Sequence, residues 1–416
     1  MERKRQVTRV VVTGVGAVSP LGIGADALWT GLTEGRSGIA PIESFDTSDL
    51  DVKIAGEVNG FAPRDFMDFK AARRMDRFAQ FAVAATREAM EMANLTVTDD
   101  NTDRIGVMVN TGGGGFPTIE REVEVKAKSG AKRVSPFLIP MFAPNMASCQ
   151  VSMAFGIHGP TATSVAACAA GIQAFVDAVH MIERGDADVV ITGGTEGGIT
   201  PVAIASLSNM GALSRNNDNP EGASRPFDTA RDGFVFSEGA GIAILESEEH
   251  AARRGANALA YVGGGSYTCD AFHITAPDPE GKGASRAMQQ AMNRCGLAPE
   301  DFQYIAAHAT ATNIGDIAET GAVKQAFGDH AYKLALSANK SMVGHLLGAA
   351  GAISSLQCIL AIRDGIVPPT INLENQDPEC DLDYVPNVAR NMTVNNALAN
   401  GFGFGGQNAV CVFSAI

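Results

Sequence analysis

A cysteine at the start of an apolar helix pattern is well suited to nucleophilic chemistry. Cys168 lies within the small-residue stretch Val165–Gly171, and the residues that follow place apolar side chains at helical spacing. A helix N-terminus presents unpaired N–H groups and partial positive charge, which favour the nucleophilic thiolate over the thiol. A buried core cysteine gives the same local pattern, so the interpretation depends on the other chemical residues.

Two histidines and a lysine follow short apolar stretches in the second half of the chain. His308 lies in the segment 307–312, and Lys340 and His345 lie in the segment 339–345. An imidazole at a strand end, among small residues and hydroxyls, can face a cleft. A lysine in an Ala- and Gly-rich region needs a partner or a shifted pKa. The alternatives are a hydrogen-bonded core histidine and an exposed loop lysine.

Two further segments combine glycine, aromatic or charged residues. The segment 401–406 reads Gly-Phe-Gly-Phe-Gly-Gly, in which glycines let backbone N–H groups approach a ligand and phenylalanines exclude water. A tight turn before the last strand is the alternative. The segment 224–234 contains Arg225, Asp228 and Arg231, and we assign this charge-paired loop a scaffold role.

Predicted strands and helices alternate along the chain. The predicted strands are 9–13, 105–109, 189–192, 241–245, 258–262, 304–307, 334–337 and 409–413. The predicted helices are 25–33, 71–92, 284–294, 318–327 and 346–362, with a further helix after Cys168. This alternation predicts an α/β protein with right-handed crossovers and mostly parallel sheets. The matching helices after Cys168 and His345 indicate one unit used twice, with the halves fused on a shared core.

Composition limits the class of protein. The net charge of −14 argues against a broad nucleic-acid footprint. The seven cysteines form no C-x-x-C pair, so neither a zinc site nor a redox dithiol is predicted, and their odd number suits a reducing compartment. No apolar run approaches roughly 18 residues, and the basic segment Met1–Arg5 precedes a strand, not an apolar leader. We therefore expect a cytoplasmic protein without a membrane span.

Local basic sets leave room for an acidic protein partner. Lys70, Arg73, Arg74 and Arg77 form one set at spacings that partly share a helix face. The second set is Lys126, Lys128, Lys132 and Arg133. A solvated helix or loop explains either set taken alone.

Taken together, the motifs resemble the β-ketoacyl-acyl-carrier-protein synthases of the thiolase-like condensing enzymes, above all the elongating type II enzymes of bacterial fatty acid synthesis. The resemblance extends from 10–14 to the Phe-Gly-Phe-Gly-Gly loop, and its motifs occur in the family's order. They are Cys168 before a helix, His308-x-Thr310-x-Thr312, and Lys-Ser-Met-x-Gly-His-Leu-Leu-Gly from Lys340. The resemblance implies a thiolase-like fold of two βαβ halves, 1–257 and 258–416, in a five-layered αβαβα core.

The resemblance also implies a reaction and its residues. Cys168 takes an acyl group from a carrier thioester, malonyl-carrier loses CO2, and the enolate attacks the acyl-Cys168 carbonyl, giving a 3-oxoacyl-carrier two carbons longer. His308 and His345 form the oxyanion hole for the malonyl thioester, and Lys340 keeps the local field positive. The remaining roles are oxyanion binding by the N–H groups of Cys168 and Phe404, gating by Phe404, and pantetheine binding by Thr310 and Thr312. The phosphopantetheine arm arrives with the acyl carrier protein, and no metal or other cofactor is implied.

Several positions depart from the family pattern. Ala309 stands where glycine is usual, Ser354 where a glutamate is usual, and Gln407 where threonine is usual. The nucleophile is flanked by Ala166, Ala169 and Ala170 where hydroxylated residues are common. Gly113 replaces a bulky aliphatic residue at the acyl pocket, so we expect a deeper pocket that tolerates long or unusual acyl chains.

Related activities differ in identifiable residues. A degradative thiolase needs a second cysteine in the C-terminal glycine loop, and 401–408 contains none. Initiating enzymes carry a Cys-His-Asn set, whereas this chain has His345, and a non-catalytic chain-length partner subunit lacks the nucleophile. A type II polyketide or unusual-lipid ketosynthase uses the same residues and remains the main alternative. The family works as a homodimer, which we expect here too.

Overall fold

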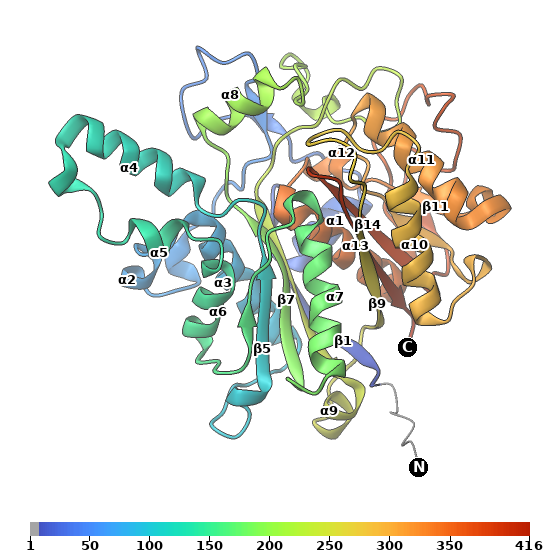
Figure 1. Ribbon diagram of the computed structural model, residues 1–416, viewed down its shortest axis with the longest axis horizontal. Coiled ribbons are helices and arrows are strands. Elements are labelled where there is room, and N and C mark those ends of the chain that lie inside the picture. The colour runs from blue at the N-terminus through green and yellow to red at the C-terminus, as the bar shows by residue number, and fades with distance from the viewer. Residues whose placement is uncertain (1–7) are drawn as a thin grey trace.

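The computed structural model describes residues 8–416, so the basic segment Met1–Arg5 lies outside the described residues. Most strands join one large mixed sheet, and helices pack on its outer faces and between its two halves (Figure 1). The first half contributes β1 (Val10–Ser19), β5 (Ile105–Asn110), β6 (Thr161–Ala162), β7 (Val189–Glu196) and β8 (Gly239–Ser247). The second half contributes β9 (Ala260–Cys269), β10 (Tyr304–Ala306), β11 (Ala335–Ser337), β14 (Asn396–Gly403) and β15 (Gln407–Ser414).

The two halves repeat one strand order. The spatial order is β11–β10–β14–β15–β9 followed by β1–β8–β7–β5–β6, with β9 hydrogen-bonded to β1. When the five strands of each half are numbered along the chain, both halves have the same order from the outer edge to the centre of the sheet: third, second, fourth, fifth and first. The short strands are β2 (Gly22–Ile23), paired with β1, and the pairs β3 (Ala40–Pro41) with β4 (Ile54–Ala55) and β12 (Ile366–Val367) with β13 (Arg390–Asn391).

Two helices at matching places in the halves form the central layer. They are α7 (Ala170–Glu183) and α13 (Ala350–Asp364), and α13 is buried along nearly its whole length, which explains its Ala- and Gly-rich sequence. The outer helices are α3 (Arg77–Met92) and α6 (Met146–Phe155) on one side, and α10 (Lys282–Cys295) and α11 (Asn313–Phe327) on the other. This gives the expected five-layered αβαβα arrangement. The remaining helices are α1 (Ala25–Thr33), α2 (Phe69–Ala72), α4 (Phe116–Ser129), α5 (Leu138–Phe142), α8 (Pro201–Asn209), α9 (Glu248–Arg253) and α12 (Lys340–Val343).

A short 3-10 turn precedes each central helix, and the two turns have one backbone shape. The turn η4 (Ala167–Ala169) leads into α7, and η8 (Leu347–Ala349) leads into α13. Their first residues both have left-handed φ angles, 46° at Ala167 and 44° at Leu347. Each turn packs on the fourth strand of the other half, η4 on β14 and η8 on β7. The surroundings of Cys168 are therefore built largely by the second half.

Two expectations about the fold are wrong. The sheet is mixed and not mostly parallel, because β8 and β15 run antiparallel to their neighbours. A tight turn joins β14 to β15, and such a turn connects only antiparallel strands. The helix predicted over 71–92 is broken into α2 and α3, because Asp76 adopts an extended backbone and its carboxylate accepts a hydrogen bond from the Thr118 N–H in α4.

The chain division at 257/258 stays a prediction. No helix within residues 8–416 is both long enough and apolar enough to cross a membrane.

Candidate active site

Cys168 lies in the middle of η4, where the backbone is strained and the side chain is buried. A left-handed φ at a residue with a Cβ, such as Ala167, costs about 1–2 kcal/mol. The turn directs the thiol away from its own half, and the Sγ of Cys168 lies 2.9 Å from Nε2 of His345. A thiol and an imidazole from different halves of the chain are therefore in hydrogen-bond contact, an arrangement that suits a nucleophile and its base.

The buried thiol corrects the expectation of a resting thiolate. Burial raises the pKa of Cys168 to about 12, although the Lys340 ammonium and the backbone N–H of Phe404 act in the opposite direction. Desolvation thus outweighs the helix terminus and the nearby lysine. At neutral pH the sulfur keeps its proton, so acyl transfer needs an adjacent base, and His345 is in place to accept that proton.

The two imidazoles face each other at the bottom of the site. His345 and His308 are both buried, and their ring centroids lie 5.5 Å apart at 84°. Burial holds both pKa values well below the usual 6.5, and the Lys340 charge lowers them further. Both rings are therefore neutral at pH 7, and a neutral imidazole donates one hydrogen bond from one of its nitrogens.

Lys340 lies behind His308 and not at the surface of a loop. Lys340 is 1% exposed, and its ammonium donates to the backbone carbonyl of His308. Burial lowers the pKa of Lys340 to about 8, while Glu319 acts to raise it. Glu319 in α11 is also buried, and its carboxylate accepts the N–H groups of His308 at 2.8 Å and Ala309 at 2.7 Å. The lysine and glutamate therefore fix the His308 backbone from two sides.

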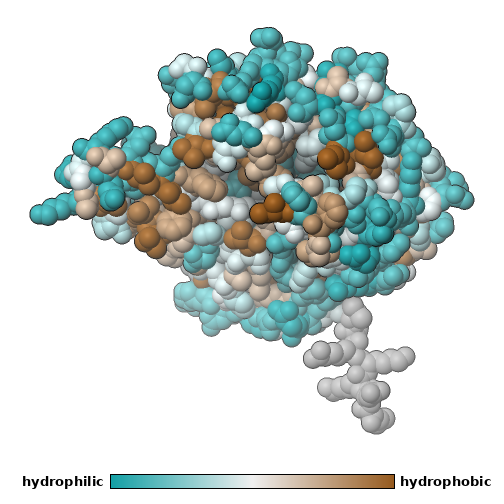
Figure 2. All heavy atoms as spheres, turned by 45° about the horizontal axis from the view of Figure 1, so that its top comes forward, coloured by the Kyte–Doolittle hydropathy of each residue, from teal (hydrophilic) through white to brown (hydrophobic). Residues whose placement is uncertain are grey.

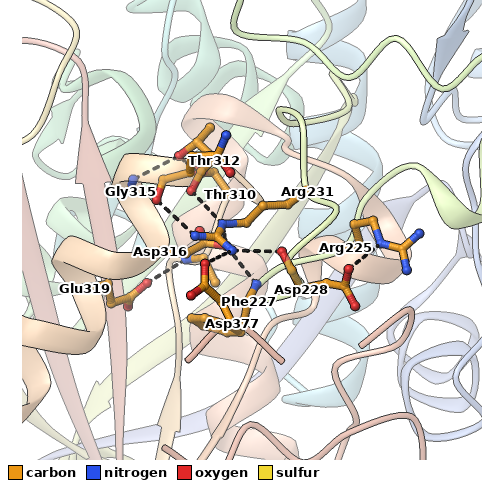
Figure 3. Close-up of polar contacts among 12 residues, drawn as sticks. Arg225, Phe227, Asp228, Arg231, Thr310, Thr312, Gly315, Asp316, Glu319 and Asp377 are labelled. Carbon is orange, nitrogen blue, oxygen red and sulfur yellow. Dashed lines mark hydrogen bonds and ion pairs between the residues drawn. The ribbon is translucent and has the colours of Figure 1, made fainter. Parts of the chain in front are cut away.

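The segment 224–234 holds the start of α11, as Figure 3 shows. The buried Arg231 guanidinium bonds to the carbonyl oxygens of Thr312 and Asn313 at 3.3 and 3.1 Å. It also bonds to the Asp377 carboxylate at 2.8 Å, and the Asp316 carboxylate lies 3.7 Å away. A buried guanidinium shared among these oxygens fixes several chain segments at once. This geometry fits the scaffold role assigned from the sequence.

The two threonines lie where this network meets the open site. The Oγ1 atoms of Thr310 and Thr312 are 3.0 Å apart, and Thr312 caps α11 by accepting the Gly315 N–H at 3.2 Å (Figure 3). Thr310 keeps hydrogen-bonding capacity toward the cavity. Ala311, between them, has a φ of 64°, and Ala309 one of 32°. Glycine adopts these angles without strain, so the alanine at 309 raises the energy of the His308 turn.

A cavity of about 350 Å³ unites most of the predicted site residues. Cys168, His308, His345, Thr310, Thr312 and Phe404 all line it, together with apolar residues such as Phe234 and Phe402. Phe404 lies in the turn between β14 and β15, and its backbone N–H points at the Cys168 thiol. The backbone thus supplies a hydrogen-bond donor beside the nucleophile. Lys340 and Gly113 are not among the cavity-lining residues.

Gly113 is covered by an aromatic ring from its own loop. A Cβ built on Gly113 would lie 2.3 Å from Cε2 of Phe116, and one built on Gly198 would lie 3.5 Å from Cδ2 of the same ring. The Phe116 side chain therefore fills the space that a larger residue at 113 would take. Phe116 is 44% exposed, so the ring has solvent on its other side.

Ser354 takes part in a buried network without an ionisable carboxylate. The Asn339 Nδ2 donates to Ser354 Oγ at 3.1 Å and to Gln357 Oε1 at 2.7 Å. The Gln357 amide in turn donates to Ser337 Oγ at 3.0 Å and to the Tyr304 hydroxyl. Neutral groups thus anchor the residue before Lys340. Gln407 is exposed and pairs with Cys269 across β15 and β9.

Sequence reasoning missed Glu319, Asp316 and Glu196, which are all buried. Asp316 and Glu319 lie three residues apart, on one face of α11, directly after the His-x-Thr-x-Thr segment. That spacing beside a catalytic motif was a usable signal. Glu196 ends an apolar strand at a Gly-Gly-Thr-Glu sequence, where it resembles a surface turn residue.

Comparisons with known proteins agree with this geometry. The family model "Beta-ketoacyl synthase, N-terminal domain" matches residues 7–251, and "Beta-ketoacyl synthase, C-terminal domain" matches residues 259–374. The chain is 50% identical to 3-oxoacyl-[acyl-carrier-protein] synthase 2 of Synechocystis sp., over 97% of each protein.

Solved structures share the whole fold. The ishigamide ketosynthase/chain length factor has a TM-score of 0.92 and 35% identity, covering 98% of this chain and 99% of that one. The AntDE ketosynthase of a type II polyketide synthase, solved with its acyl carrier protein AntF, has a TM-score of 0.91 and 32% identity, covering 99% and 100%. By its motifs, its site and these matches, the chain belongs to the β-ketoacyl synthase family.

Proposed function

We propose that this chain is the elongating 3-oxoacyl-[acyl-carrier-protein] synthase of fatty acid synthesis, with Cys168 as its nucleophile. The observation that carries the assignment of roles is the contact between Cys168 Sγ and His345 Nε2, 2.9 Å apart beside a cavity that also exposes His308. The enzyme is an acyltransferase, as its family membership implies.

In the first half-reaction the acyl group moves from the carrier to the enzyme. His345 takes the proton of the Cys168 thiol, and the sulfur attacks the carbonyl carbon of the acyl thioester. The N–H groups of Cys168 and Phe404 stabilise the oxyanion that forms. The C–S bond to the carrier then breaks, and the pantetheine sulfur leaves with the proton, so the carrier thiol and acyl-Cys168 are the products.

In the second half-reaction a carbon–carbon bond forms. The malonyl C–CO2 bond breaks, CO2 leaves, and the electron pair becomes an enolate whose oxygen accepts hydrogen bonds from His308 and His345. The enolate carbon attacks the acyl-Cys168 carbonyl, and the C–S bond to Cys168 breaks. The cysteine thiolate that leaves takes up one proton from solvent, and the free enzyme returns. Neutral imidazoles suit this role because each ring already carries an N–H that donates a hydrogen bond without prior protonation of the ring.

Lys340 and the threonines support this chemistry without reacting. The Lys340 ammonium, behind His308, keeps the potential positive where the enolate forms, and its bond to the His308 carbonyl sets that ring's position. Thr310 and Thr312 bind the amides of the phosphopantetheine arm at the cavity entrance, and the Phe404 ring separates the two half-reactions. The proposal needs no metal and no cofactor beyond the carrier's phosphopantetheine.

The acyl pocket is proposed to extend toward Gly113. The Phe116 ring is the side chain that occupies this region, so chain length depends on how far the ring moves and not on an empty, deeper pocket.

The acyl carrier protein is the proposed partner, as it is for AntDE. Lys70, Arg73 and Arg74 are exposed near α2, whereas Arg77 is bound to Glu238, with its Nη2 2.6 Å from the carboxylate. The first basic set therefore loses Arg77 as a docking residue. The second set, Lys126, Lys128, Lys132 and Arg133, is exposed along the end of α4 and the following turn.

A homodimer in the cytoplasm is the proposed assembly and location. Apolar side chains gather on the region of α4 and α5 that projects from the molecule (Figure 2). The exposed members are Phe116, Ile119, Val123, Phe137 and Ile139. An exposed apolar patch of this kind marks an interaction surface, and a second copy is the proposed occupant. Light scattering at micromolar concentration should give twice the chain mass, and a monomer would contradict the proposal.

Intact-mass spectrometry tests the function directly. The protein is mixed with a long-chain acyl-carrier and then with malonyl-carrier, beside the variant Cys168→Ala. We expect an acyl adduct on the wild type alone, followed by a 3-oxoacyl-carrier two carbons longer. Acylation without elongation would contradict the second half-reaction, and the absence of any adduct would favour a partner subunit. The 50% identity to a 3-oxoacyl-[acyl-carrier-protein] synthase 2, against 32% to the ketosynthase of a type II polyketide synthase, favours fatty acid elongation over polyketide synthesis.

A further inference from the structure

Glu196 is a buried carboxylate that the proposed reaction does not use. It ends β7 and is 1% exposed, and no Lys or Arg within residues 8–416 forms an ion pair with it. An unpaired buried carboxylate is costly unless hydrogen bonds satisfy it. Burial raises the pKa of Glu196 to about 7, against the hydrogen bonds that lower it. A buried carboxylate at this place therefore needs a physical explanation.

The Glu196 carboxylate joins two loops through their backbone. Its Oε2 accepts the N–H of Gly112 at 2.9 Å and the N–H of Gly348 at 3.0 Å, and its Oε1 lies 3.3 Å from Thr111 Oγ1. Neither glycine has room for a side chain, since a Cβ on Gly112 would lie 2.7 Å from Oε2 and one on Gly348 would lie 2.1 Å from the Gly112 N. The carboxylate and two glycines form a closed junction.

The junction occupies the counterpart of the active site in the repeated fold. The turns η4 and η8 match residue for residue, so Gly348 corresponds to Cys168. The strands β7 and β14 have equal lengths, and each packs on the turn of the other half, so Glu196 corresponds to Gly403, next to Phe404. At η4, Cys168 lines the open cavity. At η8, the Gly348 N–H donates a hydrogen bond to the Glu196 carboxylate.

The filled junction lies close to the reacting groups. The turn η8 begins two residues after His345, and it packs against η4, which carries Cys168. The Glu196 charge raises the pKa of Cys168, and the Lys340 charge lowers it. The charge of the Asp76 carboxylate also acts on Glu196 and raises its pKa.

We infer that Glu196 is a positioning residue for the condensation: its carboxylate holds the turn that follows His345 through the Gly348 N–H, and its negative charge opposes ionisation of Cys168. The inference rests on the proposed function for its effect on turnover, because His345 acts there as the base and the enolate donor. The effect on the Cys168 thiol rests on the packing of η8 against η4 and does not depend on the proposed function.

The test compares Glu196→Gln and Glu196→Ala with the matched control Glu88→Gln. The Glu88 carboxylate likewise accepts two backbone N–H groups, those of Ala17 and Ala25, and it belongs to the junction of β1 and α1, not to the site. Two readouts are measured at pH 8, where Glu196 is charged. The first is alkylation of Cys168 by iodoacetamide, followed on its own peptide, and the second is kcat and KM with malonyl-carrier.

Glutamine keeps an oxygen that accepts both N–H groups but removes the negative charge. Iodoacetamide should therefore alkylate Cys168 about tenfold faster in Glu196→Gln than in the wild type, as expected when the thiol pKa is one unit lower. Its kcat should stay near that of the wild type. Glu196→Ala should lose about 10²-fold in kcat with KM unchanged, and acetate, but not chloride, should restore part of the loss. Glu88→Gln should match the wild type in both assays.

Two results would overturn the inference: wild-type alkylation in Glu196→Gln, or wild-type kcat in a folded Glu196→Ala. If Glu196→Ala does not fold, the Gln variant decides alone. Alkylation uses no carrier, so a wild type that accepts no acyl group would contradict the proposed function and leave the thiol comparison valid.

Discussion

The turn that carries Cys168 and the turn that follows His345 share a backbone but differ in what faces them. Residues 167–171 read Ala-Cys-Ala-Ala-Gly and residues 347–351 read Leu-Gly-Ala-Ala-Gly, with the same left-handed start. The first turn opens on a cavity and the Phe404 N–H, whereas the second is closed by the Glu196 carboxylate. The same turn is therefore open to a cavity in one half and closed by a carboxylate in the other.

The difference shows where the chemistry is determined. The repeated strands and central helices place both turns, and two positions then decide their use: the residue in the middle of the turn and the residue that ends the fourth strand of the opposite half. Where the turn holds Cys168 and the opposite strand ends at Gly403, the thiol lies beside open space. Where Gly348 meets Glu196, the turn after His345 is closed by a hydrogen-bonded carboxylate.

The largest expected effect is the loss of the nucleophile. Cys168→Ala should lower elongation by at least about 10³-fold, because no other thiol among the described residues lines the cavity. Its melting temperature should change little, since only one sulfur atom is removed from a turn that already holds alanines. Product formation and thermal unfolding measure the two effects, and elongation by a folded Cys168→Ala would break the comparison.

The matching change in the other turn should act on stability. In Gly348→Ala the Cβ would meet the Gly112 nitrogen at 2.1 Å, so the free energy of unfolding should fall by about 3 kcal/mol. Gly321→Ala is the control, because its Cβ would meet nothing within 4 Å in helix α11. Denaturant unfolding compares the two variants, and equal stabilities would show that the junction is loose.

Lys340 should make decarboxylation depend on pH. The ammonium is present below its pKa of about 8 and is lost above it, so CO2 release from malonyl-carrier should slow as the pH rises through 8. Lys340→Met should be slower by about 10²-fold and should lack this decline. A wild-type rate that rises steadily from pH 7 to 9.5 would contradict the assigned role.

Gly113 and Phe116 should shift chain length in opposite directions. Gly113→Ile brings a side chain into the space of the Phe116 ring, so the preferred acyl chain should become shorter, and kcat/KM for long chains should fall about tenfold. Phe116→Ala should favour longer chains. Competition among acyl-carriers of different lengths measures both profiles. An unchanged profile in Gly113→Ile would remove this region from the acyl pocket.

The smallest effect concerns docking of the carrier. Arg73→Glu with Arg74→Glu should raise KM for acyl-carrier several-fold with kcat unchanged, and the effect should shrink in high salt. Lys126→Glu with Lys128→Glu is the matched change in the second basic set. The set whose reversal raises KM contacts the carrier, and no change in either variant would remove both from the docking surface.

Regular elements with clear periodicity were predictable from the sequence. The helix over 25–33 has the predicted ends, and the strands at 105 and 189 begin where expected. Both Val10–Ser19 and Val189–Glu196 run past their predicted ends through glycines, which read as turns in isolation but here allow close packing on neighbouring backbone. The break before α3 depends on a contact with α4, which no local pattern contains.

The site was predictable where motifs carried it, and less so where burial decided the chemistry. Cys168, His308, His345, Thr310, Thr312 and Phe404 do meet around one cavity. The protonated state of Cys168 was not predictable, because it results from burial by the opposite half. Glu196 and Glu319 were missed because each carboxylate accepts from backbone N–H groups and from one neutral side chain, Thr111 or Asn400, and the sequence does not reveal these partners.

Separating the two half-reactions tests the division of roles most directly. Wild type, Cys168→Ala and His308→Ala are each exposed to acyl-carrier, weighed intact, and then given malonyl-carrier. We expect His308→Ala to gain the acyl group on Cys168 but to form almost no elongated product, while Cys168→Ala gains none. Elongation by His308→Ala at the wild-type rate, or acylation of Cys168→Ala, would contradict it.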